Sequence, residues 1–438
     1  MSNDLQLTMD WEQLGEGSAE ERACFGRLQV RLGSIVLSEG QDGFVACART
    51  GPLVSAYPLA EWLAWNWWRL TVEPRPNAPT YEWQSAHCLC TVGAGYLWPN
   101  ITIHSDGETT VLAARPTHPT RLSPFRFTAD QTVIVPTRQF VAALDEFLSQ
   151  IQGRLRAEGL GATDFDNTWS EVLQERATPD DAAQRQLEAL LGFDPDEGDE
   201  AAIRQIMQDA RILGQHAVME LAAGHTPGRM PPTADQIQDW ARRYGHDTQP
   251  SARVHLTGLD STKPRPRRAW QRGYSAARAV RAQSRLGDGA VSDDRLADLC
   301  GVSPSLLGST EHPPLAFGLE DEAHRPGRIV LRSSYRTGRR FELARLLGDR
   351  LASGCIEALA PVSSAYTHRQ KLQRAFAAEL LCPFEALDAF LDGDYSESAQ
   401  DDAAQHFAVS ERVVERQLEN HGRLDTTALD DAERIASV

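Results

Sequence analysis

The spacing of apolar and polar residues predicts alternating helices and short strands in the first third of the chain. Apolar residues recur at helical intervals in residues 59–70 and again in residues 140–151, which predicts two amphipathic helices. Residues 101–112 consist of two β-rich runs around Asp106 and Gly107, the signature of a hairpin turn. We therefore predict an α/β domain at residues 1–155, with further strands in the runs 27–37 and 132–135.

Two further segments follow the first domain along the chain. Residues 156–262 are acidic and have helical periodicity, so they are expected to form a helical segment or linker. Residues 263–438 are predicted to form a third domain, mainly helical with a small sheet. The predicted fold class is thus α+β with several domains, which agrees with a length of 438 residues.

Six of the ten tryptophans lie between Trp62 and Trp98. Such a cluster is typical of a ligand platform or of the core of a small domain, and we favour the core. The first domain contains no glycine-rich phosphate loop, nucleophile elbow or paired His/Cys spacing that would indicate catalysis. His216, Glu220 and His225 are close in sequence, but Gly224 interrupts the helix between them, which disfavours a metal site.

Charge and cysteine content narrow the classes of function. Lys+Arg total 44 against 61 Asp+Glu, a net charge of −17, so the surface repels nucleic acid unless basic groups cluster locally. Such a cluster occurs at residues 263–285, where the acidic middle segment is an equally good internal partner for it. Only Lys263 and Lys371 are lysines, a bias that we attribute to genome base composition. Seven cysteines without framework spacing, no apolar run long enough for a membrane and no secretory signal predict reduced thiols and a cytoplasmic location.

The most informative stretch is residues 328–383. Residues 328–335 are predicted to form a strand and residues 339–351 a helix, and a second helix carries Phe-Ala-Ala-Glu-Leu-Leu-Cys-Pro at residues 376–383. In this order the chain resembles the ImmA/IrrE family of zinc metallopeptidases. The resemblance extends over residues 268–425.

The resemblance implies a zinc site whose residues are missing here. Family members carry His-Glu-x-x-His on the first helix, where the two histidines bind zinc and the glutamate activates a water molecule. The corresponding positions here are Arg345, Leu346 and Asp349, and the third, acidic ligand is not matched in residues 370–373. An arginine has no free lone pair for a metal and a leucine cannot act as a base. We therefore expect no zinc and no cofactor, and we lean against an enzyme. Arg345 and Asp349 are expected to share a helical face and to form an ion pair or to bind an external charged group.

The resemblance further implies a role. A member without its catalytic residues is expected to be a protein-binding, regulatory pseudopeptidase in a bacterial stress, toxin–antitoxin or phage-related system. Its partner is expected to be a protein or a peptide segment, with the strand at residues 328–335 as the edge of a binding groove. No membrane partner is expected. The candidate groove residues are Tyr335, Arg340, His368, Gln370 and Glu379.

Two alternatives remain open. Residues 403–418 have the apolar spacing of a helix-turn-helix, in which Arg412 and Arg416 would contact DNA, although neighbouring glutamates dilute that basic face. Alternatively, Asp349, His324 and His368 form a rearranged metal site that supports peptidase activity.

Overall fold

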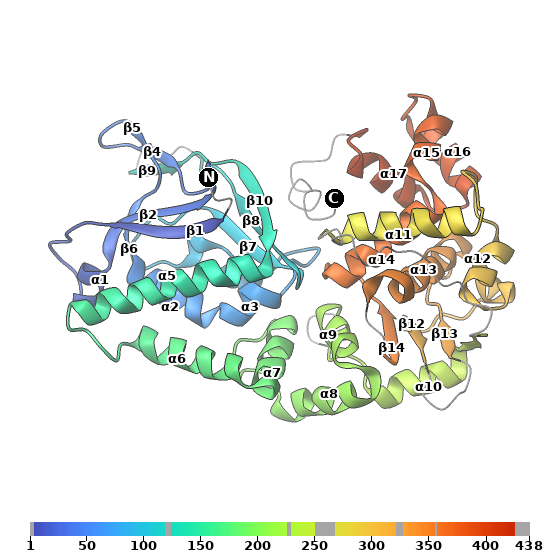
Figure 1. Cartoon of the computed structure of the whole chain (residues 1–438), viewed down its shortest axis with the longest axis horizontal. Helices are drawn as coiled ribbons and strands as arrows, with labels where there is room; N and C mark the ends of the chain where they lie inside the picture. Colours follow the sequence, from blue (N-terminus) through green and yellow to red (C-terminus); the bar gives the residue numbers. More distant parts are fainter. Residues whose placement is uncertain are drawn as a thin grey trace. The chain divides into compact units, whose positions relative to one another are not determined.

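The computed structural model describes residues 4–118, 124–225, 229–249, 268–320, 327–354 and 357–424. It is an α+β structure with several small antiparallel sheets, and it divides into two compact units, Met1–Gly198 and Asp199–Val438 (Figure 1). The segment predicted at residues 156–262 is therefore divided between the units rather than forming a part of its own. Its first helices complete the first unit and its later helices belong to the second.

Three small sheets form the β part of the first unit among the residues described. The sheets have the strand orders β1-β2-β3 with β6 beside β2, β10-β8-β7, and β5-β4-β9. The strands are β1 (Leu5–Trp11), β2 (Phe25–Leu32), β3 (Ile35–Val36), β4 (Gly40–Asp42), β5 (Cys47–Arg49), β6 (Leu53–Ser55), β7 (Ile101–Ser105), β8 (Thr109–Ala114), β9 (Phe125–Phe127) and β10 (Gln131–Pro136). The predicted hairpin is confirmed as β7 and β8, in which Ser105 pairs with Thr110 across the Asp-Gly turn.

The helices of this unit pack around those sheets. They are α1 (Ala19–Ala23), α2 (Ala56–Trp65), α3 (Trp67–Val72), α4 (Tyr81–His87), the 3-10 turn η1 (Leu89–Thr91), α5 (Thr137–Ala157), α6 (Asp164–Ala177) and α7 (Pro179–Leu190). The helix predicted around residues 140–151 is confirmed within α5, whose apolar face is fully buried. The helix predicted at residues 59–70 is interrupted at Asn66, whose side-chain amide donates to the carbonyl of Trp62. An asparagine that bonds to the backbone in this way competes with helix continuation.

The tryptophan cluster belongs mostly to the core, as predicted. Trp67, Trp68, Trp83 and Trp98 are buried, whereas Trp65 is 55% exposed. Trp65 therefore differs from the neighbouring tryptophans in exposing much of its indole ring to solvent.

The second unit combines one four-stranded sheet with helices. The antiparallel strand order is β11-β13-β12-β14. The strands are β11 (His246–Asp247), β12 (Ala316–Leu319), β13 (Arg328–Val330) and β14 (Leu359–Val362). The helices are α8 (Glu200–Leu213), α9 (Gln215–Ala223), α10 (Ala234–Tyr244), α11 (Ala269–Gln283), α12 (Asp293–Cys300), the 3-10 helix η3 (Pro304–Gly308), α13 (Arg336–Gly348), the π-helical turn η4 (Asp349–Ser353), α14 (His368–Leu381), α15 (Phe384–Leu391), α16 (Glu397–Phe407) and α17 (Glu411–Asn420).

The strand predicted at residues 328–335 is shorter than expected and is not an edge. It ends at Val330, because the backbone N–H groups of Arg332 and Ser333 donate to the Glu342 carboxylate at 2.8 and 3.1 Å instead of to a neighbouring strand. β13 also lies between β11 and β12, so both of its sides are paired. The expectation that the strand at residues 328–335 is the edge of a binding groove is therefore wrong, and the edge strands of this sheet are β11 and β14.

Helix α14 is the centre of the second unit because two other helices pack closely against it. On α11, Gly273 lies so near the backbone of α14 that a Cβ atom would approach the Leu372 carbonyl oxygen to 2.7 Å. On α13, a Cβ atom at Gly348 would be 2.6 Å from the ring of Phe376. The two glycines thus set how closely α13 and α11 approach α14, and they hold the side chains described next in contact.

Candidate functional site

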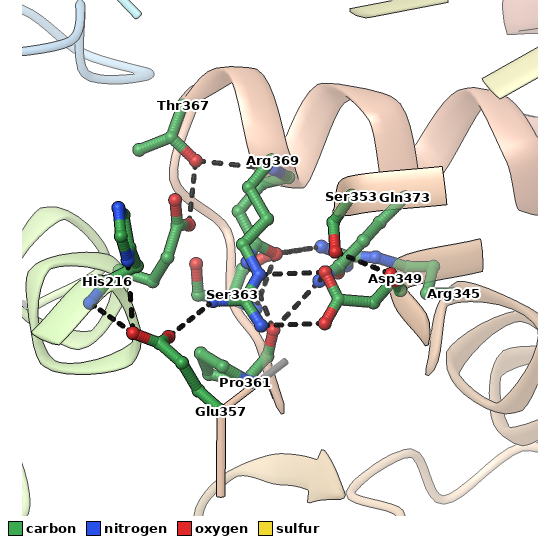
Figure 2. Close-up of polar contacts among 12 residues, drawn as sticks. His216, Arg345, Asp349, Ser353, Glu357, Pro361, Ser363, Thr367, Arg369 and Gln373 are labelled. Carbon is green, nitrogen blue, oxygen red and sulfur yellow. Dashed lines mark hydrogen bonds and ion pairs between the residues drawn. The ribbon is translucent and has the colours of Figure 1, made fainter. Parts of the chain in front are cut away.

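Arg345 and Asp349 lie on the side of α13 and its following turn that faces α14. Arg345 is in the last turn of α13, and Asp349 begins the π-helical turn that follows. Figure 2 shows both side chains directed towards residues of α14. The expectation of a shared face is confirmed, since both residues hydrogen-bond to side chains of α14.

Asp349 forms its ion pair with Arg369, not with Arg345. The guanidinium of Arg369 donates from Nε to Oδ1 and from Nη2 to Oδ2, each at 2.7 Å, and Gln373 Nε2 donates to Oδ1 at 3.0 Å. Asp349 is 2% exposed and Arg369 is 8% exposed. The predicted Arg345–Asp349 pair is thus corrected: a two-pronged contact from α14 satisfies both carboxylate oxygens, because the guanidinium fork matches a carboxylate.

Arg345 is held by neutral acceptors instead of a counter-ion. Its Nη2 donates to the Ser363 carbonyl at 2.8 Å and to Gln370 Oε1. Burial, together with repulsion from Arg374, lowers the pKa of Arg345 to about 9, so the side chain remains protonated at neutral pH. Its neighbour Leu346 is buried in the apolar core.

Two glutamines of α14 connect Arg345 and Asp349 to the edge strand β14. Gln370 Nε2 and Gln373 Nε2 both donate to the Pro361 carbonyl in β14, at 3.0 and 3.1 Å. Gln370 Oε1 also accepts from the Ser363 backbone N–H at 3.0 Å. A proline has no N–H for a strand ladder, which suits its place on an edge strand. The amides of Gln370 and Gln373 are therefore engaged in structural hydrogen bonds.

Helix α9, from the acidic middle of the chain, lies against this network (Figure 2). Its Glu220 is buried and accepts from Thr367 Oγ1 at 2.7 Å, while His216 donates from its backbone to Glu357 at 2.9 Å. Gly224 is so close to Ser363 that an added Cβ atom would lie 2.7 Å from the serine Cβ. α9 therefore packs against the chain segment that follows β14 and contributes a carboxyl group to the site.

Sequence reasoning missed the residues that complete this network. Arg369 lies before the Phe-Ala-Ala-Glu-Leu-Leu-Cys-Pro run of residues 376–383, and Glu220 is 147 residues from its partner Thr367. Local periodicity carries no information about such distant partners. The only local signal was the proximity of His216 and Glu220 on one helix, and their side chains contact different groups.

The other candidate groove residues are mostly inside the unit. Arg340 is 1% exposed and donates to the Asp293 carboxylate, and Glu379 is 1% exposed and accepts from Arg278 Nε at 2.7 Å. His368 is the buried first residue of α14. Tyr335, which precedes α13, is 76% exposed. Arg340, Gln370 and Glu379 thus connect elements of the fold, and of the five candidates Tyr335 alone is exposed.

The predicted helix-turn-helix region consists of α16 and α17, joined by a short turn in which Ala408 has a φ of 51°. Arg412 is exposed on α17, and Arg416 pairs with Glu419 at 2.9 Å. This internal pairing lowers the positive charge that α17 presents to solvent.

The described residues contain no group of three or more His, Cys, Asp or Glu side chains arranged to hold a metal. His324, one residue of the rearranged metal site considered above, lies outside the described residues. Within the same described part of the chain, no helix is long and apolar enough to cross a membrane.

The expectation of reduced cysteines needs one correction. The turn η1 folds Cys88 back onto Cys90, and the structure joins the two in a disulfide. The free cysteines among the described residues are Cys24, Cys47, Cys300 and Cys382.

Comparison with protein-family models, curated proteins and solved structures finds no match for this chain.

Replacing Arg369 with methionine should destabilise the second unit strongly. The change leaves Asp349 buried without its cation, and breaking a buried ion pair from one side costs about 3–5 kcal/mol of the free energy of unfolding. Chemical denaturation measures this loss. The matched control is Arg242→Met, because Arg242 pairs with Asp239 with side chains 74% and 62% exposed. The control should change stability by less than about 1 kcal/mol. Equal effects of the two substitutions would contradict the assignment.

The free energy of unfolding of the Glu220→Gln variant should increase relative to that of the wild-type protein as pH rises. Burial raises the pKa of Glu220, so between its unfolded value near 4.5 and its folded value the folded protein binds more protons than the unfolded one. The wild-type protein therefore loses stability over this window as pH increases, and the variant does not carry this term. Denaturation curves from about pH 4 to pH 8 test the sign. A stability difference between the two proteins that is independent of pH would refute it.

Proposed function

We propose that residues 268–424 form an ImmA/IrrE-like pseudopeptidase domain that acts as a protein-binding, regulatory module. One observation carries the proposal. The positions that match the two zinc histidines, Arg345 and Asp349, face Gln370 and Gln373 of the next helix, which is the segment where a third ligand is expected. Two positions four residues apart on one helix and a third on a facing helix are what a tetrahedral zinc site with one open position requires.

The chemistry of these side chains argues against catalysis. Arg345 stays protonated and offers no lone pair to a metal. Both oxygens of Asp349 are occupied by Arg369 and Gln373, so binding a cation there requires breaking a buried ion pair. Leu346 supplies no base. The site is therefore proposed to stabilise the domain, and function is proposed to lie on its surface.

The scaffold part of the proposal is tested by rebuilding the zinc site. The variant combines Arg345→His, Leu346→Glu, Asp349→His and Gln373→Glu, with Arg369→Met to remove the facing cation. If the arrangement derives from a zinc site, the purified variant should bind about one equivalent of zinc tightly, as measured by metal analysis after dialysis. The wild-type chain should bind none. Zinc in the wild-type protein, or none in a folded variant, would contradict the proposal.

The binding part is tested at Tyr335. This side chain is 76% exposed, and Tyr81 in the first unit is a matched control at 78% exposure. A photo-crosslinking amino acid is placed at either position in the full chain, which is then illuminated in a lysate of the source organism. We expect a discrete crosslinked protein from position 335 and none from position 81. No product from position 335, or the same products from both, would argue against a partner surface there. The kind of system, whether stress response, toxin–antitoxin or phage-related, follows from the crosslinked protein.

A further inference from the structure

A hollow of about 710 Å³ lies on the first unit, far along the chain from the network of the second. Helix α2 forms one wall, the start of α6 forms another, and residues near α1 and the turn η1 complete the rim. The volume is within the usual range for small-molecule sites. The lining residues are Ser18, Glu21, Tyr57, Pro58, Glu61, Trp62, Trp65, Asn66, Val92, Ala94, Asp164 and Thr168.

Three aromatic rings line this hollow, all from α2. Tyr57 and Trp65 are eight residues apart and therefore lie on the same face of the helix, with Trp62 next to them. The indole N–H of Trp62 donates to the Ser85 carbonyl at 3.1 Å, and that of Trp65 points to Asp194 at 3.4 Å. Because both N–H groups have protein acceptors, the two indoles offer a ligand mainly the surface of their rings. This arrangement also accounts for the 55% exposure of Trp65 beside an otherwise buried cluster.

The charged residues of the hollow are all acidic. Glu21, Glu61 and Asp164 contribute carboxyl groups, and no lining residue is Arg, Lys or His. Partial burial raises the pKa of Glu61, and the negative charges of Asp164 and Glu20 raise it further. Tyr57 and Glu61 are four residues apart on α2 and both line the hollow, so the carboxyl group lies beside the aromatic wall. A cation in the hollow would relieve this repulsion.

We propose that the hollow binds a small organic ammonium ion that carries methyl groups on its nitrogen. Such an ion uses both features, since its charge interacts with the carboxylates and with the ring faces while its methyl groups pack against the indoles. A bare metal ion fits less well, because aromatic faces do not ligate it and the carboxylates are not grouped as ligands. An anion or a neutral apolar ligand would leave the carboxylates uncompensated.

The test uses choline and its neutral analogue 3,3-dimethylbutan-1-ol, in which carbon replaces the charged nitrogen. Each compound is titrated into the full chain while the indole N–H signals are followed by NMR, and the Trp65 signal is assigned from its loss in Trp65→Phe. Choline should shift the Trp62 and Trp65 signals saturably, and the alcohol should not. Glu61→Gln should weaken choline binding by at least about fivefold, which corresponds to about 1 kcal/mol.

Two comparisons make the outcome decisive. Glu171→Gln removes an exposed carboxylate of α6 that does not line the hollow, and it should leave choline binding unchanged. A circular dichroism spectrum unchanged from wild type shows that the Glu61→Gln variant is folded. If this variant does not fold, Trp65→Ala replaces it, and a loss of choline affinity of similar size is expected. Absence of saturable shifts with choline, equal shifts with the alcohol, or equal effects of the two Glu→Gln variants would overturn the proposal.

Discussion

The second unit depends on the buried pair of Asp349 and Arg369. Removing two such charges from water costs several kcal/mol per ion, and their attraction compensates only when the remaining hydrogen-bonding atoms are also satisfied. The two bonds from Arg369 and the third from Gln373 do this for the carboxylate. The positions of α13, its π-helical turn and α14 are thereby constrained together, because a small displacement of either helix would leave a buried charge without its partner.

The same constraint explains how the neighbouring charge is accommodated. The acceptors of Arg345 are the Ser363 carbonyl and Gln370 Oε1, dipoles rather than a carboxylate. Gln370 is in turn fixed by the edge strand through Pro361, so the cation indirectly determines where β14 meets α14. Thr367, which precedes α14, supplies the hydrogen bond that Glu220 of α9 requires. A charged interior therefore connects one helix of the acidic middle segment to the sheet and to the central helices.

Much of the local structure could be predicted, and the exceptions have physical causes. The hairpin at Asp106 and the apolar face of α5 follow from short-range patterns, which act over a few residues. Glu342 ends β13 early by accepting two backbone N–H groups that a pattern of apolar residues does not reveal. In the site, the shared face of Arg345 and Asp349 followed from helical spacing, but their partners did not. Asp349 had two arginines within reach, and only the packing of α14 against α13 determines that Arg369 is the partner.

The arginine-rich composition has a structural consequence even if genome base composition is its origin. Arg369 needs a planar fork to contact both oxygens of Asp349, and Arg340 reaches the Asp293 carboxylate and two backbone carbonyls at once. A lysine ammonium is a point charge without this planar fork, so a lysine at either position could not make the same set of contacts. At position 345 the argument concerns protonation, because burial and repulsion from Arg374 lower the pKa of even a guanidinium to about 9. A lysine starts from a lower pKa and would lose its proton more readily in the same surroundings, leaving the Ser363 carbonyl and Gln370 with a weaker donor. Replacing the arginine at position 340, 345 or 369 with lysine is therefore not a conservative substitution, whatever the origin of the arginine-rich composition.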